Sequence, residues 1–200
     1  MTIVKVSIEN YNANRGVYSP LVEHNGIICG FWLCGQNYRN PTQYYGAYPP
    51  SYLKRMGWLF PDVEDYQVLH LFSGKTPPGT WKNEYFFDSN IDIRPDFPRN
   101  VCCGNAEELS TFTEGMSFDL IVSDPPYDQN YIKYGTPKVN KKKVIKECAK
   151  ILEIGGHLIW LDTIIPIWSK SDGWKLRGTI GLVQSTNHKC RVATIWEKVV

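Results

Sequence analysis

The sequence contains no apolar run long enough to cross a bilayer, for which about 20 consecutive residues are needed. It also lacks an excess of charge of one sign, because its net charge is +2 over 200 residues. That balance neither requires nor excludes a nucleic-acid partner. Internal repeats and low-complexity segments are absent, and the first residues lack the pattern of a secretory signal. These absences predict a globular cytoplasmic protein that does not act in a membrane.

The sequence also has no C-x-x-C pair, although it contains 6 cysteines. Unpaired spacings of this kind are typical of reduced intracellular thiols rather than of a disulfide framework. Cys29, Cys34 and His24 form the one set that invites a zinc interpretation, but their spacing does not match a zinc knuckle. We therefore expect no metal site.

What is present from residue 67 onward is the pattern of an α/β protein, in which short apolar runs are separated by turn residues. The expected strands are 67–72, 85–88 with an extension as far as 93, 118–123, 157–162, and a terminal antiparallel pair at 176–184 and 190–197. Residues 138–152 have the period of an amphipathic helix, which Gly155 and Gly156 are expected to end. A second, short helix is expected at 165–174.

Residues 1–47 differ from the rest in composition, being rich in tyrosine, asparagine and glycine. We treat them as an extension packed on a main domain that comprises residues 48–200. Within the extension, 27–33 reads as a short strand or one arm of a hairpin. At the start of the main domain, Ser51 is expected to cap a short helix with Leu53, Met56 and Phe60 on one face.

The most informative segment is Asp124-Pro125-Pro126-Tyr127, which directly follows the apolar run 118–123. Proline has no N–H and a fixed φ, so the segment forms a rigid strand end at which Asp124 and the Pro125 carbonyl remain as acceptors. Tyr127 adds a flat ring beside them. Two acceptors and a stacking plane suit a planar group that carries an NH2. A plain proline-rich surface turn is the alternative reading.

With this motif, residues 45–198 resemble the S-adenosylmethionine (SAM)-dependent amino-methyltransferases, whose catalytic motif reads D/N/S-P-P-Y/F. Their substrates are mostly adenine or cytosine amino groups in DNA, with some RNA members. Further segments match in the family's order: 48–53 (Y-P-P-S-Y-L), 68–74 (V-L-H-L-F-S-G), 91–95 (I-D-I-R-P), 104–106 (G-N-A), 152–158 (L-E-I-G-G-H-L) and 191–198 (R-V-A-T-I-W-E-K). The resemblance implies an α/β fold with a doubly wound, Rossmann-like class I methyltransferase sheet, an antiparallel C-terminal strand and a short irregular N-terminal extension.

The resemblance also implies which residues form the site. The implied catalytic residues are Asp124, Pro125, Pro126 and Tyr127. The implied SAM-binding residues are Tyr48, Pro49, His70, Phe72, Ser73, Gly74, Asp92, Asn105, Ala106 and Asp124. Three assignments have alternatives: Asp88 replaces Asp92 as the ribose ligand if the second strand ends earlier, Asn105 is a plain turn residue, and His70 is a packed strand-end histidine.

The sequence departs from the family pattern in its first loop, which usually reads D-x-F-x-G-x-G. His70 stands in place of the acid and Thr76 in place of the second glycine. Pro77 and Pro78 follow where a helix should begin, so we expect that helix to be short or missing. Only about a dozen residues then join the first two strands, near the lower limit for a parallel crossover. No segment is long enough to form a separate target-recognition domain.

Two further features bear on a nucleic-acid partner. A basic stripe on the expected helix comprises Lys138, Lys142, Lys146 and Lys150, with Lys141 and Lys143 between them. It is expected either to contact phosphates or to be an ordinary solvated face. The aromatic N-terminal segment, with Arg15, Arg39, Tyr44 and Tyr45, is the other place where substrate contact is expected.

The expected reaction is methyl transfer from SAM to an exocyclic amino group of a nucleobase, with adenine N6 in DNA as the first choice. An enzyme acting on RNA or on a small molecule keeps the same chemistry and is the first alternative. A protein that binds SAM or nucleic acid without turnover is the second, motivated by His70 and Thr76. The partner expected on this basis is nucleic acid.

Overall fold

The computed structural model describes residues 4–14, 20–34, 48–72, 74, 76, 79–88, 101–127, 131, 138–184 and 190–200. The strands are β1 Leu21–His24, β2 Ile27–Cys34, β3 Val68–Leu71, β4 Glu84–Asp88, β5 Val101–Cys103, β6 Phe118–Ser123, β7 Leu152–Asp162, β8 Trp174–Gln184 and β9 Cys190–Lys198. The helices are α1 Ile8–Asn14, α2 Tyr52–Leu59, α3 Leu109–Phe112 and α5 Lys141–Ile151, with short 3-10 turns η1 Val63–Asp65, η3 Ala106–Glu108 and η4 Lys170–Asp172.

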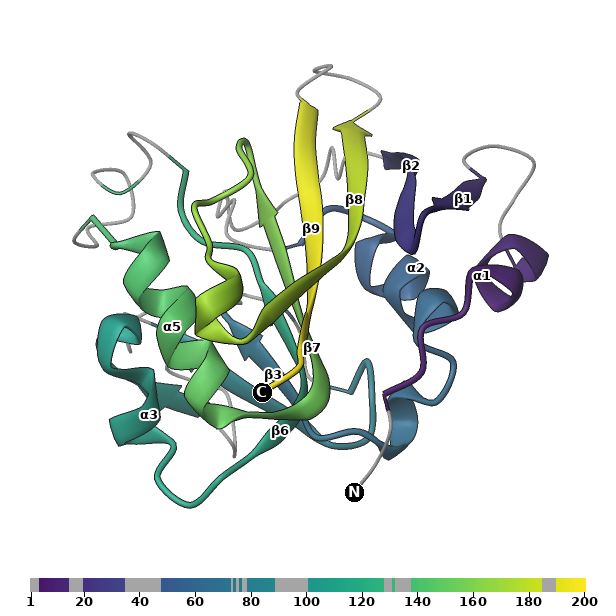
Figure 1. Ribbon diagram of the computed structural model, residues 1–200. Helices are drawn as coiled ribbons and strands as arrows, with labels where there is room; N and C mark the ends of the chain where they lie inside the picture. The colour runs from purple at the N-terminus through teal and green to yellow at the C-terminus, as the bar shows by residue number, and fades with distance from the viewer. Residues whose placement is uncertain are drawn as a thin grey trace.

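The strands form one 9-stranded sheet in the order β1-β2-β8-β9-β7-β6-β3-β4-β5 (Figure 1). The run from β7 to β5 is parallel, whereas β9 is antiparallel to both of its neighbours, β7 and β8. From β3 the chain first builds outward through β4 and β5 and then returns to place β6 on the other side of β3. The expected doubly wound sheet with an antiparallel C-terminal strand is confirmed. Ligands of such sheets bind beyond the strand ends at this reversal.

The core lies in two layers, one on each face of the sheet. Successive residues of β6 supply both layers, since Leu120 and Val122 belong to one cluster and Ile121 to the other. Met56 of α2 packs in the first cluster and Val144 of α5 in the second. Accordingly, α1 and α2 lie on one side of the sheet and α3 and α5 on the other (Figure 1). Both faces of the central strands are therefore covered, as in other parallel sheets.

The N-terminal segment is more regular than expected, because much of it belongs to the sheet. β1 and β2 form an antiparallel hairpin whose turn holds Asn25 and Gly26 at φ 51° and 75°. An Asn-Gly pair with both φ values positive is favoured in two-residue hairpins. β2 then pairs in parallel with β8 over its whole length, and Trp32 is fully buried beneath it. The expected hairpin arm at 27–33 is confirmed.

Of the two expected short helices, one is present and the other is not. The first is confirmed as α2, but the side chain of Ser51 makes no cap hydrogen bond, because its backbone is left-handed at φ 66° rather than extended as in an ordinary N-cap. The second, expected at 165–174, is wrong: only η4 is helical there. The segment before η4 instead lies against the sheet, where the ring of Trp168 meets that of Trp196 at 6.3 Å between centroids.

The long amphipathic helix is confirmed as α5, although the glycines do not end it. α5 gives way to β7 at Leu152 without a loop, so Gly155 and Gly156 lie inside the strand. Gly155 has φ 84° at a bulge, where the register between β6 and β7 shifts. A Cβ at Gly156 would lie 2.8 Å from the carbonyl oxygen of Asp119. Gly155 therefore supplies the left-handed backbone of the bulge, and Gly156 permits a close approach of two strands.

Other expectations on the sheet hold where the chain is described. β3, β4, β6, β7, β8 and β9 appear at the expected strands, and the described residues between β3 and β4 contain no helix. Pro77, Pro78 and the extension of β4 toward residue 93 lie outside the described residues. None of the described helices has the length and apolar character needed to span a membrane.

The burial of His157 in β7 predicts a loss of stability in acid. Its side chain is 3% exposed and meets the Phe60 ring edge-on, and burial lowers its pKa to about 4. The unfolded chain binds a proton at this histidine near pH 6.5, whereas the folded protein binds it only near pH 4. The contribution of neutral His157 to the free energy of unfolding is therefore lost as the pH falls from 6.5 to 4. His157→Phe should remove a loss on the order of 3 kcal/mol over that window.

Urea unfolding at several pH values between 7.5 and 4.5 would measure the effect. His24→Phe is the matched control, because His24 is exposed. The assignment to His157 is contradicted if both variants lose stability in acid as steeply as the wild type does.

Candidate active site

The strand ends at the reversal of the sheet bring together the residues of the first loop and those of the D-P-P-Y motif. β3 and β6 are neighbours in parallel register, with Leu71 opposite Ser123. The pairing continues one step further, where the Asp124 N–H donates to the Leu71 carbonyl at 3.3 Å. Phe72 and Asp124 therefore leave the sheet at the same edge. The site is thus built on the two central strands of the domain.

The first loop turns sharply as it leaves β3. Phe72 and Gly74 have φ values of 58° and 54°, and a positive φ is uncommon for any residue other than glycine. Phe72 N–H donates to the Phe87 carbonyl at 2.9 Å, and Gly74 N–H donates to Asp88 Oδ1 at 3.0 Å. Asp88, at the end of β4, thus fixes the loop with a carboxylate that is almost fully buried.

This geometry bears on the ribose ligand expected at the end of the second strand. β4 ends at Asp88, which lies against the first loop, whereas Asp92 and Ser73 lie outside the described residues. Asp92 stays a prediction. The position of Asp88 at the end of β4 favours Asp88 over Asp92 as the ribose ligand, because acids at such strand ends meet nucleosides.

The turn after β5 has a structural role that the sequence alone left open. Asn105 caps η3 by accepting a hydrogen bond from Glu107 N–H at 3.0 Å. Ala106 is buried in the cluster beneath α5. A contact between either residue and a cofactor adenine therefore stays a prediction, and the capping role of Asn105 is the part that the geometry supports.

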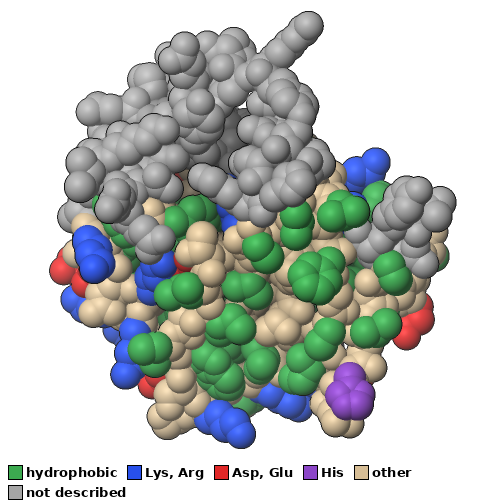
Figure 2. Space-filling view, turned by 90° about the horizontal axis from the view of Figure 1, so that it is seen from above, with side chains coloured by type: hydrophobic (Ala, Val, Ile, Leu, Met, Phe, Trp, Pro, Cys, Tyr) green, Lys and Arg blue, Asp and Glu red, His purple; other side chains and the backbone are tan. Residues whose placement is uncertain are grey.

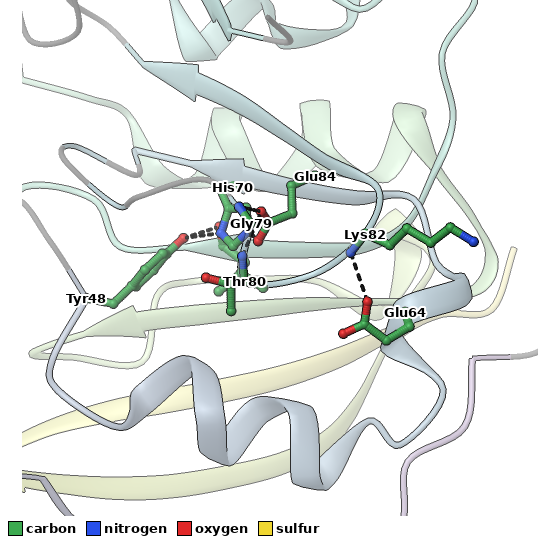
Figure 3. Close-up of polar contacts among 8 residues, drawn as sticks. Tyr48, Glu64, His70, Gly79, Thr80, Lys82 and Glu84 are labelled. Carbon is green, nitrogen blue, oxygen red and sulfur yellow. Dashed lines mark hydrogen bonds and ion pairs between the residues drawn. The ribbon is translucent and has the colours of Figure 1, made fainter. Parts of the chain in front are cut away.

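His70 of β3 lies in a polar chain that connects β4 to β6 (Figure 3). Its Nε2 lies 3.1 Å from Glu84 Oε1 and its Nδ1 lies 3.3 Å from the Tyr48 hydroxyl. Tyr48 in turn donates to the Val122 carbonyl at 3.0 Å. Because Val122 precedes Ser123 and Asp124, the chain joins β4, β3 and the segment before α2 to the end of β6.

The surroundings of His70 are those of a packed residue. Its ring is fully buried and stacks with Trp81 and Phe86, both at an interplanar angle of 14°. Burial raises the pKa of Glu84, but the hydrogen bond and charge of His70, together with backbone hydrogen bonds from Gly79 and Trp81, lower it overall. Glu84 also accepts hydrogen bonds from the loop that follows β3. His70 is therefore a packed residue that links β3 to β4 and to Tyr48, and a direct cofactor contact stays a prediction.

In the motif itself, Asp124 and Tyr127 are brought into contact. The Tyr127 hydroxyl donates to Asp124 Oδ1, and both side chains are half-buried. Pro125 is buried between them and Pro126 is partly exposed. The hydrogen bond restricts the carboxylate to one orientation, while a carboxylate has about four lone-pair sites and retains acceptor capacity.

The neighbours of Asp124 shift the pKa of its carboxyl in both directions. Burial raises the pKa of its carboxyl to about 6, Arg191 and the Tyr127 hydroxyl oppose that rise, and Asp162 adds to it. At pH 7 the carboxyl is mostly ionised and able to accept hydrogen bonds. Carboxyl groups with a raised pKa in a concave site are typical of functional positions.

The sequence interpretation did not place Asp162 or Arg191 in the site, and it assigned Lys141 only to the basic stripe. Asp162 is fully buried at the end of β7, where it binds Lys141 Nζ at 2.6 Å and Trp160 Nε1 at 3.0 Å. The available signal was that Asp162 ends an apolar strand, as Asp124 does. Arg191 lies at the start of β9, with its Cζ 4.9 Å from the centroid of the Tyr127 ring, and no local pattern indicated it.

The basic stripe of α5 is largely neutralised by neighbouring acids. The pairs are Lys141–Asp162, Lys143–Glu107, Lys146–Asp172 and Lys150–Glu147. Seen from above, isolated lysines and arginines surround apolar side chains on the described part of the surface (Figure 2). These pairs favour a solvated helix face over a phosphate-binding stripe. Arg15, Arg39, Tyr44 and Tyr45 lie outside the described residues.

A metal has no evident place in the described part of the chain, where no cluster of three or more His, Cys, Asp or Glu side chains is found. Cys29, one member of the zinc alternative, directs its thiol to the Ile27 carbonyl. Cys34 is buried as a free thiol.

The buried pair between Lys141 and Asp162 predicts a specific sensitivity. Breaking it leaves an uncompensated charge at a side chain that is 0% exposed, so Lys141→Met should lower the free energy of unfolding by on the order of 2–3 kcal/mol. Lys142→Met is the matched control, since Lys142 is exposed on the same helix and should change stability by less than about 0.5 kcal/mol. Equal effects of the two substitutions in urea unfolding would rule out the buried pair as the cause.

Comparison with known proteins adds information on the fold. No protein-family model and no curated protein sequence matches the chain. Among solved structures, TrmN from Thermus thermophilus matches with a TM-score of 0.55 and 17% identity, covering 78% of this chain and 50% of TrmN. A putative SAM-dependent methyltransferase from Streptococcus mutans matches with a TM-score of 0.47 and 15% identity, covering 92% of this chain and 56% of the other.

The chain thus spans about half the length of TrmN. At 17% identity this likeness shows the fold, and it agrees with the strand order described above. On both grounds, the chain has the Rossmann-like fold of the class I SAM-dependent methyltransferases.

Proposed function

We propose that this protein is a SAM-dependent methyltransferase that transfers a methyl group to an exocyclic amino group of a nucleobase, with adenine N6 in DNA as the first choice. The observation that carries the proposal is the position of Asp124. Its carboxylate stands at the end of β6, at the reversal of a class I methyltransferase sheet, bonded to Tyr127 within D-P-P-Y.

The first loop fits a SAM molecule in its chemistry. The left-handed turn at Phe72 and Gly74 brings backbone close to the strand ends, and Asp88 places a carboxylate beside it. Such an acid suits ribose hydroxyls, and a glycine allows close approach of the methionine part. Phe72, Gly74 and either Asp88 or Asp92 would hold the cofactor. When bound, SAM supplies an electrophilic methyl group on a positively charged sulfur.

The protein's own contribution is to make a weak nucleophile reactive. The lone pair of a nucleobase amine is conjugated into the ring. Hydrogen bonds from the NH2 to Asp124 and to the Pro125 carbonyl favour a tetrahedral nitrogen, and the same acceptors stabilise the positive charge that develops on it. The proton then leaves to water or to Asp124. Because the amine lies within a stacked base in a duplex, the base must flip out, and Tyr127 offers it a stacking surface.

RNA and small molecules with an exocyclic amine would use the same acceptors, so they are alternatives within the proposed chemistry. Loss of turnover with retained SAM binding is the remaining alternative. Of the two residues that motivated this alternative, His70 is explained by packing, because it is buried and bonded to Glu84 and Tyr48.

The primary test is nucleoside mass spectrometry of DNA and RNA from cells that express the wild type or Asp124→Ala. Asp124→Ala should reduce methylation by on the order of a hundredfold while sparing SAM affinity, because the lost interaction forms mainly in the transition state. Asp65→Ala is the control, since Asp65 is an exposed acid in η1. A methylated base seen only with the wild type and the control identifies both the base and the polymer.

Two outcomes would decide against the proposal as stated. Methylation in RNA alone would replace DNA with RNA as the substrate. No modified nucleoside in either pool, with SAM affinity confirmed by titration, would remove the nucleobase and leave a small molecule or a binding protein.

The raised pKa of Asp124 predicts opposite effects on stability and on activity. The unfolded carboxyl ionises near pH 3.8, whereas the folded one keeps its proton until about pH 6. This contribution to stability is therefore full below pH 3.8 and lost as the pH rises through 6. Asp124→Asn should be more stable than the wild type at pH 7 by about 1–3 kcal/mol.

The same substitution should flatten the pH profile of methyl transfer, because the acid limb near pH 6 reports ionisation of Asp124. Thermal unfolding at pH 4 and pH 7, together with initial rates from pH 5 to 8, measures both effects. An acid limb that persists in Asp124→Asn would assign the titration to another group.

A further inference from the structure

Arg191 reaches the motif from β9, which β7 separates from β6 in the sheet. It lies at the start of β9, opposite Leu182 of β8, and is half-buried. Its side chain projects to the same face as Ala193 and Ile195, since alternate residues of a strand share a face. That face also carries α2 and Tyr52, whose buried hydroxyl lies within the electrostatic reach of Asp124 and Arg191.

The guanidinium of Arg191 lies over the face of the Tyr127 ring, with Cζ 4.9 Å from the ring centroid. At its other end the ring carries the hydroxyl that donates to Asp124 Oδ1. Arg191, Tyr127 and Asp124 therefore form a continuous series from a cation through an aromatic ring to a carboxylate. A cation within about 6 Å of a ring centroid is attracted by the π electrons, and the planar guanidinium can stack there as an ammonium cannot.

The groups around Asp124 differ in charge, and this difference gives Arg191 a specific electrostatic role. Asp162 opposes ionisation of Asp124 from β7, and its own partner is Lys141 of α5. Tyr127 supplies a hydrogen bond and Tyr52 faces the site from α2 as a neutral phenol. Among the described groups that act on the Asp124 carboxyl, Arg191 is the one that carries a positive charge.

We infer that Arg191 is a positioning residue for the methyl transfer, which fixes the Tyr127 ring against the Asp124 carboxylate and balances the charge of that carboxylate. The inference rests on the proposed function for its catalytic meaning, but the geometry and the charge balance exist without substrate. With one face of the Tyr127 ring covered by the guanidinium, the flipped base stacks on the opposite face. Arg191 thereby also defines the side from which the acceptor enters.

The test compares Arg191→Gln, which removes the charge, with Arg191→Lys, which keeps the charge and loses the planar contact. Arg177→Gln is the matched control, because Arg177 of β8 pairs with Glu197 away from the motif and the substitution removes the same charge. The first measurement is the titration of the Asp124 carboxyl carbon by NMR in aspartate-labelled protein, with the signal assigned from Asp124→Asn. It requires no turnover.

In Arg191→Gln the Asp124 carboxyl should titrate about one pH unit or more above its position in the wild type, which is the usual effect of losing an adjacent opposite charge. Arg191→Lys and Arg177→Gln should titrate close to the wild type. A titration in Arg191→Gln that coincides with that of the wild type overturns the inference. If Arg191→Gln does not fold, Arg191→Lys decides through its rate.

The second measurement is the pH profile of methyl transfer. The acid limb should move to higher pH in Arg191→Gln alone. Arg191→Lys should keep the acid limb at its wild-type pH but have a maximal rate roughly threefold to tenfold lower, as expected for a lost stacking contact. A full maximal rate in Arg191→Lys overturns the positioning of Tyr127. If the wild type transfers no methyl group to any nucleobase, the proposed function fails, while the NMR titration still decides the role of Arg191.

Discussion

The pairing of β6 between β3 and β7 is the constraint on which the site depends. All six residues of β6 are buried, and they supply both layers of the core. Because these contacts fix where β6 ends, they also fix where Asp124 leaves the sheet and which loop it faces. The prolines after Asp124 then prevent the strand from continuing into a helix or a longer ladder. The stability of the sheet and the placement of Asp124 therefore come from the same contacts.

The carboxylates at the strand ends oppose this stability. Burial raises the pKa of Asp124 and the nearby Asp162 adds to that rise, so an ionised carboxylate at this position lowers the free energy of unfolding at neutral pH. Each has a cation from a different element, Lys141 for Asp162 and Arg191 for Asp124. If Asp124 has the proposed catalytic role, an ionisable acid is retained there at a cost in stability, which is a common compromise between stability and activity.

The parts that the sequence predicted are those with local signals. The apolar run 118–123, the amphipathic period of α5 and the D-P-P-Y motif all depend on neighbours in the chain. The interaction of Arg191 with Tyr127 joins β9 to a segment some 60 residues earlier, so no spacing indicated it. Gly155 and Gly156 show the opposite case. The pair was predicted to end the helix, but it lies within β7, where the bulge and the close approach of β6 require glycine.

The parallel pairing of β2 with β8 has a consequence for synthesis. It joins Ile28 to Gly178, about 150 residues apart. A ribosome therefore exposes β2 long before β8 exists, and β8 covers Trp32 only after about 150 further residues have been made. Parallel pairing across such a separation has a high loop-closure cost and is slow. β8 and β9 lie between β2 and β7 in the sheet, so the N-terminal hairpin can join the sheet only after both of these strands have been made.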